Sequence, residues 1–131
     1  MGEHPNAAKM REAAARFVAG DLDGFMATFS DDIVWRSGGS SALSGIYKGK
    51  GEVAGWFGKI REFAGDTIDV EPVDVLADDE HLTIFLHITA ERDDQVLDVE
   101  VANAFRVDPD GRWKESWYLP NDQAAWDRFF S

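Results

Sequence analysis

The residue best placed to do chemistry in this 131-residue chain is an amide among apolar side chains. Asn103 falls in the segment Gln95–Val107, where apolar residues alternate with polar or small ones. That period is typical of a strand with one face on a core. An amide in the apolar row must find hydrogen-bond partners, because a stranded buried polar group costs about 1–3 kcal/mol. Backbone or water partners would satisfy it, and the alternative is a cavity in which Asn103 holds a ligand.

Other reactive groups are scarce in this sequence. The chain has no cysteine, which excludes disulfides, thiolate nucleophiles and cysteine metal ligands. Its three histidines, His4, His81 and His87, lack the helical spacing of a metal-ligand pair. We therefore expect neither a metal site nor a cofactor. The Gly- and Ser-rich segment 38–49 lacks the Gly-Lys-Ser/Thr ending of a phosphate-binding loop, and we interpret it as a flexible loop.

Helices are predicted where apolar residues recur three and four positions apart. The first covers Asn6–Ala19, a second short helix follows Asp21 as its cap, and a third covers Lys50–Ala64. Gly55 and Gly58 interrupt the third helix, and we expect them to allow close approach of the helix to the sheet.

Strands are predicted where the apolar period changes to two. They cover Ile33–Ser37, Thr67–Ala77 with a bulge or edge at Pro72, His81–Arg92, Gln95–Val107 and Arg112–Leu119. A last one or two helical turns follow Pro120. Three helices, then strands, then a terminal helix predict an α+β fold. The long antiparallel sheet must twist and coil around the helices stacked on one of its faces.

Composition narrows the possible partners. Hydrophobic residues make up 44% of the chain, enough for a single domain over residues 1–131 with its own core. A formal net charge of −12 argues against binding nucleic acid and against docking on anionic lipid. The start Met1–Pro5 lacks the basic residues and apolar run of a secretory signal, and no apolar run reaches membrane-spanning length. We therefore expect a cytoplasmic protein.

Short motifs along the chain also suggest a family. They are Gly20–Leu22 with Phe29–Trp35, then Tyr47–Lys50 before a helix, then Asn103–Arg106 with Asp110–Arg112. In this order, the chain from about Ala8 to Phe130 resembles the nuclear transport factor two-like superfamily and, within it, SnoaL-like and ketosteroid-isomerase-related proteins. The resemblance implies a cone-shaped, cystatin-like α+β fold, a deep pocket between helices and sheet, and frequently a homodimer. The fold hosts isomerases, cyclases, hydrolases and non-catalytic modules, so it does not select a function.

The catalytic residues of these relatives do not carry over to this sequence. The resemblance places the steroid-isomerase tyrosine at Ala13, the carboxylate base at Ser37 and the protonated acid at Asn103. All three residue types differ, although Asn103 still has N–H groups to donate to an oxygen. The SnoaL-like cyclase aspartate falls on Tyr118, a better donor than base. Asn103 and Tyr118 are thus the candidate catalytic residues, which would polarise a carbonyl or hydroxyl.

The strand parity that turns Asn103 inward predicts a mostly apolar pocket with a few polar anchors, typical of small-molecule sites. The alternative is a core filled by the same aromatic side chains. The expected ligand-binding residues are Phe17, Trp35, Ser37, Tyr47, Phe57, Leu86, Ile88, Val99, Val101, Asn103, Ser116 and Tyr118. The nearest acids are Glu115, which should face outward, and Asp122, which should cap the last helix.

The opposite face of the sheet predicts a second copy of the chain as a partner. Its expected residues are Phe85, His87, Ala102, Ala104, Trp113 and Trp117. So much aromatic surface calls for a cover, and a homodimer supplies one, with His87 as an interface residue.

Two function hypotheses follow. The first is an isomerase, cyclase or hydrolase acting on a hydrophobic, oxygen-bearing compound. The second is a non-catalytic module that uses the pocket for a ligand or the dimer for assembly, and the lack of a placed base favours it.

Overall fold

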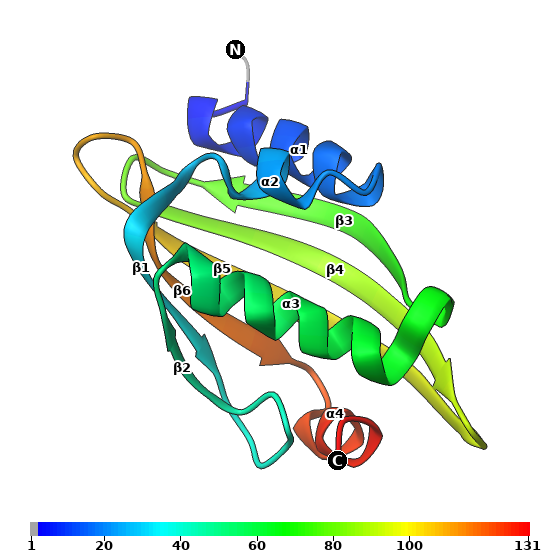
Figure 1. The fold of residues 1–131 in the computed structure, drawn as a ribbon. Coiled ribbons are helices and arrows are strands. Elements are labelled where there is room, and N and C mark those ends of the chain that lie inside the picture. Colours follow the sequence, from blue (N-terminus) through cyan, green and yellow to red (C-terminus); the bar gives the residue numbers. More distant parts are fainter. Residues whose placement is uncertain (1–2) are drawn as a thin grey trace.

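A curved sheet with helices on its concave side makes up the structure, a computed structural model that describes residues 3–131 (Figure 1). The elements in chain order are α1 (Pro5–Val18), α2 (Leu22–Met26), β1 (Phe29–Ser37), β2 (Gly45–Lys48), α3 (Lys50–Ala64), a 3₁₀ turn (Gly65–Thr67), β3 (Asp69–Ala77), β4 (His81–Arg92), β5 (Gln95–Val107), β6 (Trp113–Pro120) and α4 (Gln123–Phe129). The predicted α+β class with a coiled sheet is confirmed.

Local signals set the helix ends. Pro5 occupies the first turn of α1, where its missing N–H costs nothing. Asp21 caps α2 by accepting from the Gly24 N–H at 2.8 Å, and Asp122 caps α4 by accepting from the Ala125 N–H at 3.0 Å, as the sequence predicted. Gly65 ends α3 with a φ of +57°, a conformation that favours glycine.

The six strands lie in the order β2-β1-β6-β5-β4-β3. Within residues 3–131 each neighbouring pair is antiparallel except β1 and β6, which run parallel. The sheet is therefore mixed, and β1 and β2 precede α3 rather than following all three helices. Strand β3 is at the edge, and its pairing with β4 shifts register between Pro72 and Asp74. The bulge and the edge position predicted at Pro72 are thus both confirmed.

Several predicted boundaries were wrong. Strand β1 begins at Phe29 rather than Ile33, and β3 begins at Asp69 because Thr67 belongs to the 3₁₀ turn. Strand β2 lies inside segment 38–49, which was expected to be a loop. Most of β2 is exposed, so it has no apolar row that would mark it as a strand.

The prediction that Trp113 lies on the outer face was wrong, because strand β6 contains a bulge. The pairing of β5 with β6 jumps from Arg106–Glu115 to Val107–Trp113, which leaves Lys114 without a partner. The extra residue reverses the alternation, and Trp113 is fully buried on the same side of the sheet as Ser116 and Tyr118.

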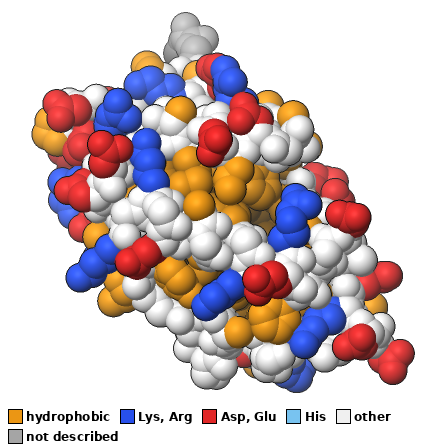
Figure 2. Space-filling view, viewed as in Figure 1, with side chains coloured by type: hydrophobic (Ala, Val, Ile, Leu, Met, Phe, Trp, Pro, Cys, Tyr) orange, Lys and Arg blue, Asp and Glu red, His pale blue; other side chains and the backbone are white. Residues whose placement is uncertain are grey.

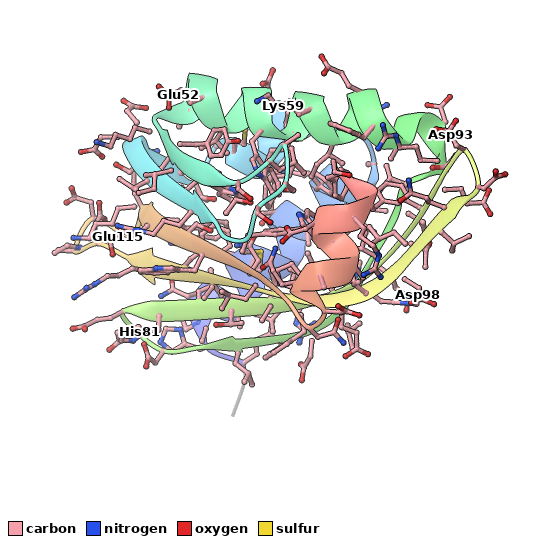
Figure 3. All side chains as sticks on the ribbon, turned by 90° about the horizontal axis from the view of Figure 1, so that it is seen from below. Glu52, Lys59, His81, Asp93, Asp98 and Glu115 are labelled. Carbon is pink, nitrogen blue, oxygen red and sulfur yellow. The ribbon has the colours of Figure 1, made fainter. Side chains whose placement is uncertain are left out.

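The core fills the concave side of the sheet and is largely aromatic. Trp35 stands near its centre, with ring centroids 5.1 Å from Trp56 and 5.9 Å from both Phe105 and Tyr118. Trp126 of α4 continues the chain of rings at 5.3 Å from Tyr118. Figure 3 shows α3 and α4 on this side, while labelled Asp98 and His81 lie on the convex side. These rings position the walls of the site described below.

Gly55 and Gly58 do not serve the close helix–sheet approach predicted for them. A methyl group added at either position would meet nothing within 4 Å, and both residues are exposed. No helix within residues 3–131 combines the length and apolar character needed to cross a membrane.

Candidate functional site

A cavity of about 480 Å³ opens between the α1–α2 side of the molecule and α3. Figure 2 shows hydrophobic side chains gathered in a hollow between these elements. Ala14 and Phe17 of α1 form one wall and Phe57 of α3 another, while Ile84 and Leu86 of β4 belong to the floor.

Charged groups are confined to the surface end of the lining. Within residues 3–131 the lining side chains that carry a charge near neutral pH are Asp69, at the start of β3, and Arg61, in the last turn of α3. Both are exposed, and the Arg61 side chain lies 3.9 Å from Asp66 on the 3₁₀ turn. The rest of the lining holds no carboxylate that would serve as a buried base.

Asn103 lies at the floor of the cavity and is 3% exposed. Its Nδ2 donates to Ser116 Oγ at 2.8 Å and to the Trp117 carbonyl oxygen at 3.1 Å. Because a carbonyl oxygen only accepts, this contact fixes which end of the amide is nitrogen. Both N–H groups are therefore used within the protein, and the prediction that Asn103 donates to a ligand does not fit this geometry.

The amide oxygen of Asn103 is in the opposite situation. Among residues 3–131 no group donates to Oδ1. The Oδ1 atom is also not fully enclosed by the surrounding protein atoms. Asn103 therefore presents an accessible acceptor at the floor of the cavity.

Tyr118 faces Asn103 directly across the β5–β6 pair and also lines the cavity. Within the described part of the chain its hydroxyl has no hydrogen-bond partner, yet it is not fully enclosed. Burial raises the pKa of Tyr118 above its usual range, because the phenolate would lose its hydration. The hydroxyl therefore stays protonated and is available as a donor.

Six of the predicted ligand-binding residues come together in the lining. They are Phe17, Phe57, Leu86, Ile88, Asn103 and Tyr118. Alternation along the strands and the apolar stripes of α1 and α3 indicated these positions.

The other six predicted residues lie outside the lining. Trp35 and Ser116 are fully enclosed, and Ser116 acts as the partner of Asn103. The Tyr47 hydroxyl donates to the Leu43 carbonyl at 2.9 Å, which directs it away from the cavity. The remaining three are buried strand residues that pack in the core: Ser37, Val99 and Val101.

Several further lining residues were not among the predicted ligand-binding residues. Ala14 lines the cavity where the resemblance had pointed to its buried neighbour Ala13. The others missed are Val18, Gly20, Leu22, Phe25, Ala54, Gly58, Ile60, Arg61, Ile68, Asp69, Val70, Pro72 and Ile84. Those on β3 and at helix ends lie where the apolar period changes and the facing side cannot be assigned. Ile60 and Ile84, in contrast, belong to the predicted apolar faces of α3 and β4.

Neither of the two acids considered from the sequence reaches the cavity. Glu115 points outward on β6 (Figure 3), and Asp122 caps α4. Within residues 3–131, no cluster of His, Asp and Glu side chains could hold a metal ion.

Comparisons with known proteins agree with this architecture. Bal32a, from a soil-derived mobile gene cassette, is 28% identical, with a TM-score of 0.88 and 96% of each chain covered. TerC, co-crystallised with polyporic acid, is 14% identical, with a TM-score of 0.81 and coverage of 97% of this chain and 98% of that one. A putative SnoaL-like polyketide cyclase from Jannaschia is 15% identical, with a TM-score of 0.70 and coverage of 92% and 91%. No curated protein matches the sequence.

The family itself is shown by sequence. The model of the SnoaL-like domain matches residues 10–116, which span α1 to β6 and include Asn103. The match covers most of the chain and confirms the resemblance drawn from the short motifs. This chain therefore belongs to the SnoaL-like domain family.

Proposed function

We propose that the cavity binds a small, mostly hydrophobic molecule that carries oxygen. The observation that carries the proposal is the composition of the lining, in which apolar side chains surround two neighbouring polar groups, on Asn103 and Tyr118. Its volume of about 480 Å³ suits a drug-sized compound. A few placed polar groups in an apolar hollow orient such a ligand without a charge.

The two glycines of α3 offer a matched test of this proposal. Gly58 lines the cavity, whereas Gly55 is exposed elsewhere on the same helix, and both have open space around the Cα. A leucine at position 58 should occupy the opening without disturbing the fold. We expect Gly58→Leu to weaken binding of the neutral fluorescent probe N-phenyl-1-naphthylamine by about tenfold or more, since contacts and space are lost together.

The control is Gly55→Leu, which adds the same side chain outside the cavity. Its affinity for the probe should equal that of the unaltered protein in a fluorescence titration. Equal affinities for both variants would show that the probe binds elsewhere and would reject the cavity as the site.

A second candidate function is an enzyme of the isomerase, cyclase or hydrolase kind. It is favoured by the protonated Tyr118 hydroxyl, which can polarise a carbonyl, and by the fold shared with a protein named as a putative polyketide cyclase. Binding without catalysis has the stronger support, because the lining places no buried carboxylate near Asn103 or Tyr118.

Turnover separates the two candidates. Incubation with hydroxylated aromatic ketones, followed by mass spectrometry, would reveal any conversion. If the protein is an enzyme, Tyr118→Phe should reduce turnover about 100-fold or more while the domain stays folded. Unchanged turnover in this variant would reject the role of Tyr118.

We also propose that a second copy of the chain covers the outer face of the sheet. Here the outer face means the convex surface around Phe85, Ala102, Ala104, Trp117 and Leu119. Leu119 is 52% exposed, and the others are partly exposed. A contiguous apolar patch of this kind is typical of an interface between proteins.

The charges around the outer face support a two-fold partner. Arg36 lies over the Trp117 ring at 5.0 Å, and Arg106 lies on the same side of the patch. Acidic Glu71 and Glu100 flank His87 beyond Phe85, on the other side. A two-fold axis through the patch would bring Arg36 of each copy towards the acidic side of its partner, while Arg106 lies opposite Glu115 of its own chain.

A further inference from the structure

The polar pair at the cavity floor restricts the chemistry of the ligand further. This inference rests on the proposed binding function and adds the kind of group that the ligand buries there. Asn103 offers an acceptor because Ser116 and Trp117 occupy both of its N–H groups. Tyr118, its partner in the β5–β6 register, offers a donor.

Asn103 and Tyr118 line the same cavity and lie directly opposite each other in the β5–β6 pair. One ligand in the cavity can therefore contact both side chains. A complementary ligand has a donor for the Asn103 oxygen and an acceptor for the Tyr118 hydroxyl.

An anionic group does not complement this pair. A carboxylate carries only acceptors, so one of its oxygens would face the Asn103 carbonyl oxygen and gain nothing from it. The cationic side chain of the lining, Arg61, is exposed at the end of α3 and is paired with Asp66 rather than placed at the floor. An ion at the floor would therefore lose its hydration without a counter-charge.

We infer that the cavity selects neutral ligands whose buried end carries both a donor and an acceptor, such as a hydroxyl and a carbonyl, or a carboxamide. The Asn103 oxygen accepts from the donor and the Tyr118 hydroxyl donates to the acceptor. This assignment reverses the polarity expected from the sequence, in which Asn103 was to be the donor.

Three naphthalene compounds of similar size test this selectivity at pH 7.5. 2-Naphthamide has both donor and acceptor, methyl 2-naphthoate has acceptors only, and 2-naphthoate is an anion. Calorimetry on the unaltered protein should show 2-naphthamide binding about tenfold or more tightly than either of the others, because each of those leaves the Asn103 oxygen unpaired.

Two variants test whether Asn103 and Tyr118 cause this selectivity between the naphthalene compounds. Asn103→Leu should remove most of the difference between 2-naphthamide and the methyl ester, because the acceptor is gone. Tyr118→Phe should weaken binding of both 2-naphthamide and the methyl ester but keep the ratio of their affinities. The Asn103 oxygen still accepts from the N–H group of 2-naphthamide in this variant. Circular dichroism confirms that each variant is folded, and the comparison of probes on the unaltered protein does not depend on either variant.

The outcomes separate this inference from the proposed function. Equal affinities for 2-naphthamide and its ester, or tighter binding of 2-naphthoate, would overturn the inference and leave a binding cavity in place. Failure of all three compounds and of N-phenyl-1-naphthylamine to bind would overturn the proposed function, and the inference with it.

Discussion

At the scale of single residues, the backbone carbonyl of Trp117 determines whether Asn103 offers the cavity a donor or an acceptor. The alternation along β5 was enough to predict that Asn103 is buried and faces the helices. Which end of its amide meets a ligand was not predictable, because it depends on the Trp117 carbonyl of the neighbouring strand. The catalytic roles assigned to Asn103 and Tyr118 stay predictions, and the structure supplies the directions of the Asn103 hydrogen bonds.

His87 gives a prediction at the same scale. Its Nε2 lies 2.7 Å from Asp98 Oδ1 on the outer face, and this hydrogen bond raises the pKa of His87 above its usual value of 6.5. Glu71 and Glu100 act in the same direction, while partial desolvation opposes them. The stabilisation by the pair is complete below the pKa of the unfolded histidine and is lost as the pH rises through the higher folded pKa.

An NMR titration of the histidine ring protons measures this effect. Asp98→Asn should lower the pKa of His87 towards 6.5, because the side-chain hydrogen bond that raises it is weakened. A His87 pKa that does not respond to the substitution would contradict the assigned cause.

At the scale of elements, long periodic segments were predictable and irregular ones were not. The bounds of α3, β4 and β5 match the prediction, because each has a sustained apolar period. Strand β2 was missed because it buries little, and the orientation of Trp113 was wrong because the bulge at Lys114 is set by pairing with β5. A register shift of one residue leaves no mark in composition, yet it exchanges the two faces of a strand.

The bulge makes Trp113 and Trp117 a matched pair on β6. Trp113 is fully buried against Phe29 and Phe105, whereas Trp117 is partly exposed. Trp113→Ala should lower the free energy of unfolding by about 3–5 kcal/mol, because it opens a large cavity in the core. Trp117→Ala should cost less than half as much.

Urea unfolding of dilute protein measures both variants, so that association contributes little to the result. Equal losses for Trp113→Ala and Trp117→Ala would mean that the alternation is not reversed and that the bulge is misplaced.

At the scale of the whole molecule, the sequence predicted the layers but not the whole connectivity. The family resemblance implied the cone and the pocket, and alternation supplied much of the floor. The parallel pair β1–β6 joins segments far apart in the sequence, and no local pattern signals such a pairing. The cytoplasmic location and the absence of nucleic-acid or lipid partners stay predictions from the N-terminal sequence and net charge.

The proposed dimer is tested at this scale. Trp117→Glu places a charge in the centre of the apolar patch, so sedimentation velocity should show a shift from dimer to monomer at concentrations where the unaltered protein is dimeric. The control is Gly55→Glu, which adds the same charge on exposed α3 and should leave the dimer intact. A monomer for the unaltered protein at all workable concentrations would refute the second-copy proposal.

The position of β6 between β1 and β5 also constrains how the chain can be made. On the ribosome, β1 and β2 emerge early and β3, β4 and β5 follow, but the two sets remain separate until residues 113–120 leave the exit tunnel. Until then the nascent protein displays unpaired backbone along both β1 and β5, the kind of edge that recruits other chains. The sheet that floors the cavity is therefore complete only after β6 has been made, and a transcript truncated before Trp113 would encode an aggregating fragment rather than a smaller binder.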